Sequence, residues 1–188
     1  PTDNNATLLK AGYDSVLRLL IDSKAYTLVD DQAVPDWDKA KAGVIFEQML
    51  LKAGGKLDAV VSANEGLGLA AVAVLKKYKL NGKVCVSGHT AGVDGLRAIL
   101  RGDLTVTVYE AIKAEAEAAT ALSIALFKGV VPTIITGSVY NGAITVPSVL
   151  LVPVAITKAN VKDVIADGFQ TREAVCAGIE ELCTANGI

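Results

Sequence analysis

Amides, carboxylates, a threonine and one tryptophan stand directly after predicted strands of this chain. They include Trp37 at the end of DQAVPDW, Asn64 in SANEG and Thr90 in SGHTAG. An open parallel sheet binds its ligands at the carboxyl ends of its strands, which is where these residues lie. Amides and carboxylates bind neighbouring hydroxyl groups, and an indole face packs against the apolar face of a sugar ring. The residue types therefore indicate a site for a small, sugar-like molecule.

A further polar group opens the chain, in the sequence PTDNNATLL. Asp3 and Asn5 precede an amphipathic helix, and they would join the same rim if a strand came before them. Because residue 1 is not methionine, we expect the sequence to begin in mid-fold. Helix capping is the alternative for Asp3 and for Asn64, and a hydrophobic staple is the alternative for Trp37.

The elements that must position these residues alternate between apolar strands and helices. Strands are predicted at 25–30, 57–63, 83–88 and 104–109, with an extended stretch at 143–156. Helices are predicted near the N-terminus, at 36–54, at about 65–78, at 93–102, at 111–129 and through most of the remainder. Such alternation predicts an α/β fold, with an open parallel sheet covered by helices on both faces.

Composition narrows the class of protein. With 188 residues, of which 52% are hydrophobic, the chain is long enough to bury the core of one domain or slightly more. Its 18 basic and 20 acidic residues are interspersed, which argues against a nucleic-acid or anionic-membrane surface. No apolar run reaches the ~18 residues needed to insert across a bilayer.

The three cysteines leave the redox compartment open. Cys85 lies in the apolar run KVCVSG, which predicts a buried, inert thiol. In an unbroken helix, Cys176 and Cys183 would be about 10.5 Å apart, too far for a disulfide. Gly178 lies between them and would allow the helix to break and the two to meet. No cysteine has a histidine at zinc-ligand spacing, so no metal site is expected.

An enzymatic function finds little support in the motifs. Gly66, Gly68 and Ala71 match the loose dinucleotide fingerprint, but the acid expected roughly 20 residues later is absent. The only histidine, His89, has no nucleophile motif around it, so it is more readily interpreted as a structural donor. We therefore expect no catalytic residues and no cofactor.

Longer stretches of the sequence carry a family resemblance in unbroken order. They are PTDNNA (1–6), DQAVPDW (31–37), DAVVSANEGLGLAAVAVL (58–75), GKVCVSGHTAGVDGLRAI (82–99), LTVTVYEAI (104–112) and PSVLLVPVAITKANVKDVIADGF (147–169). With these stretches the chain resembles the type I periplasmic sugar-binding proteins of ABC transporters, most closely their D-xylose-binding branch.

The resemblance implies a two-lobed clamp that closes on a monosaccharide and then docks on a membrane permease. It implies a periplasmic or extracellular location, with a lipid anchor as one option for an upstream N-terminus. It places sugar-hydroxyl contacts on Asp3, Asn5 and Asn64, and ring stacking on Trp37.

Two positions depart from the xylose pattern. Thr90 stands where the family has an aspartate, and Glu110 stands where it has a lysine. One change removes a charge and the other reverses one, so a different hydroxyl pattern is expected at the site. The resemblance therefore implies a monosaccharide, a pentose or a hexose, without fixing xylose.

The resemblance also implies a division of the chain. Residues 1–103 and 130–188 are expected to form the C-terminal lobe, and 104–129 to belong with an N-terminal lobe upstream. The helix in 104–129 becomes apolar nearly all round and needs cover on more than one side. We expect that cover to come from the missing lobe or from a second copy of the chain.

Two other functional classes remain as alternatives. The effector lobe of a LacI-type repressor shares this fold, and an upstream helix-turn-helix would identify it, whereas a signal peptide would identify a transport protein. A nicotinamide-dependent oxidoreductase is the weaker alternative. A binding protein that feeds a sensor kinase in place of a permease would have the same sequence features.

Overall fold

Short parallel strands form the centre of the fold in the computed structural model, which describes residues 2–188. Strands β1 (Ala59–Val60) and β2 (Cys85–Val86) pair in parallel, and a parallel bridge between Ser87 and Val106 leads on to β3 (Thr107–Tyr109). Strand β6 (Val154–Ile156) runs antiparallel to β3, so the strand order is β1-β2-β3-β6. The carboxyl ends of β1, β2 and β3 therefore point the same way.

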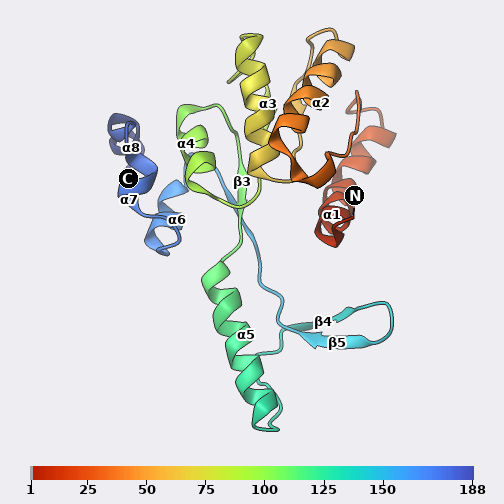
Figure 1. Ribbon diagram of the computed structural model, residues 1–188, viewed down its shortest axis with the longest axis vertical. Coiled ribbons are helices and arrows are strands. Elements are labelled where there is room, and N and C mark those ends of the chain that lie inside the picture. The colour runs from red at the N-terminus through yellow and green to blue at the C-terminus, as the bar shows by residue number, and fades with distance from the viewer. Residues whose placement is uncertain (1) are drawn as a thin grey trace.

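Helices flank these strands on both sides, which confirms the predicted α/β class. Figure 1 shows α2 and α3 side by side on one side of β3, with α4 and the C-terminal helices on the other. The helices of this part are α1 (Asn4–Asp22), the 3-10 turn η1 (Pro35–Trp37), α2 (Lys39–Lys52), α3 (Glu65–Lys77), α4 (Val93–Arg101), α6 (Val161–Ala166), α7 (Arg172–Cys176) and α8 (Glu180–Ala185).

The core lies between the strands and the helices α2, α3, α4, α6, α7 and α8, whereas α1 has no buried residue. Its largest fully buried side chains are mostly aliphatic, with Thr107 as a polar member: Leu50, Leu75, Leu96, Ile99, Leu100, Leu104, Ile156, Val86, Val161, Val164, Val175 and Thr107. Each aliphatic side chain of this kind contributes about 1.5–3 kcal/mol when it is fully removed from water. We call the strands β1, β2, β3 and β6 with α1, η1 and these helices the compact part.

The remaining residues, 110–153, form an arm that extends away from the compact part (Figure 1). The arm consists of α5 (Ile112–Phe127) and a hairpin of β4 (Gly137–Tyr140) and β5 (Thr145–Ser148). No residue of α5 is buried. The arm joins the compact part through the residues after β3 and before β6.

The expected excursion 104–129 divides differently in space. Residues 104–109 pair with neighbouring strands of the compact part, and both Leu104 and Tyr109 are buried. The protruding segment begins only at residue 110 and continues past 129 to residue 153. Its assignment to a second lobe remains a prediction.

One expected strand is not formed. Residues 27–30 carry no strand pairing, although the sequence predicts a strand at 25–30. An extended segment becomes a strand only when a neighbour satisfies its backbone N–H and C=O groups. The side-chain link that holds this segment to α2 is an ion pair between Asp30 and Lys52, with N and O atoms 3.0 Å apart.

The prediction for Cys85 is wrong, and the disulfide that the sequence left open is formed. Cys85 is exposed, so the prediction of a buried thiol is wrong. Val84 and Val86 point into the core, while Cys85 alternates with them and shares its face with the exposed Ala59 of β1. Cys176 and Cys183 form a disulfide, with Cα atoms 5.9 Å apart. The chain breaks between α7 and α8 at Gly178, whose φ is +74°, as the disulfide requires.

In the described part of the chain, no helix combines the length and the apolar character that crossing a membrane requires.

Candidate ligand-binding site

Asp3 and Trp37 lie together, although 34 positions separate them in the sequence. The Nε1–H group of Trp37 donates a hydrogen bond to Oδ2 of Asp3 at 3.1 Å. The other oxygen, Oδ1, accepts from the backbone N–H of Asn5 at 2.9 Å, so Asp3 also caps α1. Asp3 is therefore a helix cap that also contacts Trp37, and its predicted role in ligand binding stays a prediction.

The backbone at Trp37 and at the residue before it has an unusual conformation. Asp36 and Trp37 have φ angles of +59° and +55°, which non-glycine residues rarely adopt. The strained turn η1 is followed by Asp38, whose carboxylate caps α2 by accepting from the N–H groups of Ala40 and Lys41.

Asn5, the second predicted site residue near the N-terminus, lies exposed in the first turn of α1.

Asn64 caps α3. Its Oδ1 accepts a hydrogen bond from the backbone N–H of Leu67 at 2.9 Å, as a helix N-cap does. A capping asparagine uses its carbonyl oxygen in this way and keeps two donors on its amide nitrogen. Capping thus leaves the donors of Asn64 available for a ligand hydroxyl.

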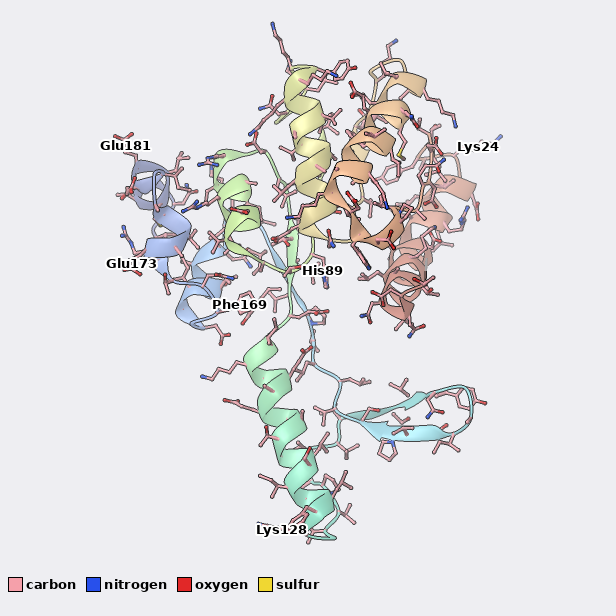
Figure 2. The ribbon with its side chains drawn as sticks, viewed as in Figure 1. Lys24, His89, Lys128, Phe169, Glu173 and Glu181 are labelled. Atoms are coloured by element: carbon pink, nitrogen blue, oxygen red, sulfur yellow. A yellow bond between two sulfur atoms is a disulfide. The ribbon has the colours of Figure 1, made fainter. Side chains whose placement is uncertain are left out.

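A second group forms where β2 and β3 end. Thr90 is exposed, and its backbone N–H donates to the carbonyl of Val108 at 2.8 Å. Nε2 of His89 lies 3.1 Å from Oε1 of Glu110, the first residue of the arm. Figure 2 labels His89 at the junction of the compact part and the arm. The structure thus brings the two departures from the xylose pattern to one junction and adds His89 to them.

Sequence reasoning missed the role of Glu65. This residue is only 7% exposed, and its carboxylate accepts hydrogen bonds from the Thr107 hydroxyl at 2.5 Å and the Gly92 N–H at 3.0 Å. Burial raises the pKa of Glu65 above its ordinary value, although these hydrogen bonds oppose the shift. The available signal was an acid that directly follows a strand and opens an otherwise apolar helix.

Two contacts involve predicted site residues, and the second of them includes His89, which was not predicted to belong to the site. Asp3 contacts Trp37 in one, and His89 contacts Glu110 in the other. A hollow of ≈ 410 Å³ borders the second group, between Glu110, α5 and the segment 149–153. Among the described residues, no cluster of three His, Cys, Asp or Glu side chains could hold a metal ion.

Comparison with known proteins identifies the family of this chain. A family model described as a periplasmic binding protein domain matches residues 1–130. The D-xylose-binding periplasmic protein of Escherichia coli (strain K12) is 39% identical over 170 residues, which cover 90% of this chain and 51% of the relative. The protein of the same name from Haemophilus influenzae is 36% identical over 93% of this chain and 53% of its own length. The chain thus spans about half the length of these curated relatives.

Solved structures agree on the fold. An ABC transporter solute binding protein from Clostridium phytofermentans, with bound β-D-glucose, matches 93% of this chain and 57% of its own with a TM-score of 0.79 and 21% identity. A carbohydrate transporter solute binding protein from Chloroflexus aurantiacus, in complex with D-glucose, has a TM-score of 0.69 and 23% identity over 76% of this chain and 43% of its own. At such identities the likeness shows the fold, and it extends over about half of each of these solved chains.

Proposed function

This chain belongs to the periplasmic binding protein domain family, and on that basis we propose that it is one lobe of a sugar-binding protein of an ABC importer. The names of its relatives support a monosaccharide as the ligand, since two of them at 36–39% identity are D-xylose-binding proteins. The proposed function is binding and delivery, with no catalytic step. The proposed location is the periplasm.

The hydrogen bond between Trp37 and Asp3 is the observation that carries this proposal. A sugar site of this class needs a flat apolar surface beside a hydroxyl-binding group. Asp3 holds the indole by its Nε1–H, which leaves the aromatic face for ring contact. The same carboxylate has further lone pairs for ligand hydroxyls. We include Asn5 and Asn64 as amide partners of the same ligand.

The ligand we propose is neutral, a pentose or a hexose. Glu110 contributes an acceptor for hydroxyl hydrogens where the xylose pattern has a lysine, and Thr90 contributes a hydroxyl where it has an aspartate. A negatively charged sugar would lie near the carboxylates of Asp3 and Glu110, which disfavours it.

The second lobe is also part of the proposal. The relatives are about twice as long as this chain, and we propose that their remaining half corresponds to an N-terminal lobe that faces the site. The arm, residues 110–153, would belong structurally with that lobe. A membrane permease is the proposed downstream partner, as for other binding proteins of importers.

A ligand screen on the full protein tests the function. Melting temperatures are measured with a panel of monosaccharides that includes D-xylose and D-glucose, and with NAD as a control. A ligand present at 100 times its Kd stabilises the folded state by about 2.7 kcal/mol, which is an easily measured shift. A shift with NAD and none with any sugar would contradict the proposal.

A further inference from the structure

The loop that carries Thr90 has an unusual backbone. Residues 88–92 connect β2 to α4, and within them Thr90 and Ala91 have φ angles of +134° and +56°. Two successive non-glycine residues in this region are unfavourable, and such conformations persist only where their surroundings fix them. The loop therefore requires contacts with the surrounding structure that stabilise this conformation.

Glu65 provides such contacts through hydrogen bonds to the loop and to Thr107. Its Oε2 accepts from the N–H of Gly92, and its Oε1 accepts from the Thr107 hydroxyl. The same hydroxyl oxygen lies 3.4 Å from the N–H of Ala91, which donates to it. The backbone N–H of Glu65 donates to the carbonyl of His89 at 3.2 Å. Three of the five loop residues are thus attached to Glu65, directly or through Thr107.

The Glu65 carboxylate packs closely against a glycine of α4. A Cβ atom on Gly95 would lie 2.1 Å from Cδ of Glu65, so the carboxylate packs directly on the first turn of α4. The N-cap of that helix, Gly92, offers no side-chain cap, and the positive end of the helix dipole favours an anion there. An apolar residue in place of Glu65 would be easier to bury but would accept neither hydrogen bond.

We infer that Glu65 is a positioning residue of the ligand site, whose carboxylate holds the loop 88–92 in the conformation that presents Thr90 and the His89–Glu110 pair to the ligand. This inference rests on the proposed function for the identity of the ligand. The conformation of the loop itself is measurable without any ligand, which separates the two.

The test compares Glu65→Ala with Glu65→Gln in the full protein. We expect faster hydrogen exchange at the backbone of residues 88–92 in Glu65→Ala. If the competent loop falls to about one tenth of the population, the Kd for the sugar rises about tenfold. Glu65→Gln should restore both readouts toward wild type, because its carboxamide keeps an acceptor for Gly92 and offers a donor to Thr107. The sugar is D-xylose or D-glucose, whichever stabilises the wild type more in the screen above.

Glu47→Ala is the matched control. Glu47 lies on α2 and pairs with Lys77 of α3 at 2.5 Å, so its loss removes a carboxylate contact to the same helix without touching the loop. Loop exchange and sugar affinity should be unchanged in Glu47→Ala.

The outcomes separate the two claims. Loop exchange in Glu65→Ala at the wild-type rate overturns the positioning role, whatever the sugar affinity. If the wild type binds no sugar, the proposed function fails, and loop exchange alone then decides the role of Glu65. If Glu65→Ala does not fold, Thr107→Val takes its place, since it removes only the hydroxyl between Glu65 and Ala91; wild-type exchange at Ala91 in that variant also overturns the inference.

Discussion

Leu75 and Leu126 are both helical leucines, yet their surroundings are opposite. Leu75 of α3 is fully buried, whereas Leu126 of α5 is 69% exposed. The difference extends to the two regions that contain them. The compact part has a buried aliphatic core, although its helix α1 contributes no buried residue, whereas α5 has no buried residue and carries Phe127 with 92% exposure. The compact part therefore contains its own core, whereas the arm, residues 110–153, has no buried residue and exposes apolar side chains.

The largest expected effect is on the free energy of unfolding, and it should differ between the compact part and the arm. Leu75→Ala should lower the free energy of unfolding by about 2–5 kcal/mol, because it leaves a cavity in the compact part. Leu126→Ala, the matched substitution on the arm, should change it by about 0.5 kcal/mol or less. Denaturant unfolding of both variants measures the difference. A loss of similar size in both would show that the arm is packed as tightly as the compact part.

Association of the chain provides the second comparison. The arm exposes many large apolar side chains, and contiguous apolar surface favours contact with another protein surface. We expect residues 1–188 on their own to self-associate as concentration rises, and we expect Phe127→Lys with Val131→Lys to reduce that association. Light scattering over a concentration series measures both. A stable monomer of the unsubstituted chain at every concentration would contradict the account of the arm.

Asn64 allows capping and ligand binding to be separated within the compact part. Asn64→Ala should lower stability by about 0.5–2 kcal/mol through loss of the N-cap. Asn64→Ser keeps a capping oxygen and should retain most of that stability while losing the amide donors. Thermal unfolding and sugar titration are measured together. Equal sugar affinity in Asn64→Ser and wild type would leave Asn64 with a capping role only.

The smallest expected effect concerns the pH dependence of stability. The pKa of Glu65 is raised by burial, so the folded chain binds a proton at pH values where the unfolded chain has released it. The contribution of Glu65 to stability therefore increases as pH falls from neutral toward the ordinary carboxyl range, and it decreases as pH rises. Glu65→Gln lacks this dependence, while the other carboxylates are common to both proteins. Wild type should gain stability relative to Glu65→Gln on acidification, and a relative loss would contradict the direction of the shift.

Local patterns predicted the elements of both regions well. The predicted helices at about 65–78 and 111–129 correspond to Glu65–Lys77 and Ile112–Phe127, because helical periodicity and capping residues are properties of neighbouring positions. The alternation of strands and helices gave the α/β class for the same reason. The disulfide depended on a chain break at Gly178, which the sequence allowed but did not require.

Features that depend on distant partners were not accessible in the same way. The segment 25–30 has the composition of a strand, but pairing needs a neighbouring strand that its own residues do not specify. The exposure of Cys85 depends on which face of the strand is covered by a helix. At the site, residue types indicated Asp3 and Trp37, but their hydrogen bond spans 34 positions. The partner of Glu65, Thr107, is 42 positions away, so no local pattern could identify their contact.

The affinity for a monosaccharide in Trp37→Ala tests the central claim most directly, namely that the compact part carries a sugar site. Calorimetric titration of the full protein compares this variant with wild type and with Tyr26→Ala, which removes an exposed aromatic ring outside the site. Loss of the ring contact should weaken binding by about 1–3 kcal/mol, with the fold intact and Tyr26→Ala unchanged. Wild-type affinity in Trp37→Ala would show that the indole only supports the turn before α2, and would contradict the proposed site.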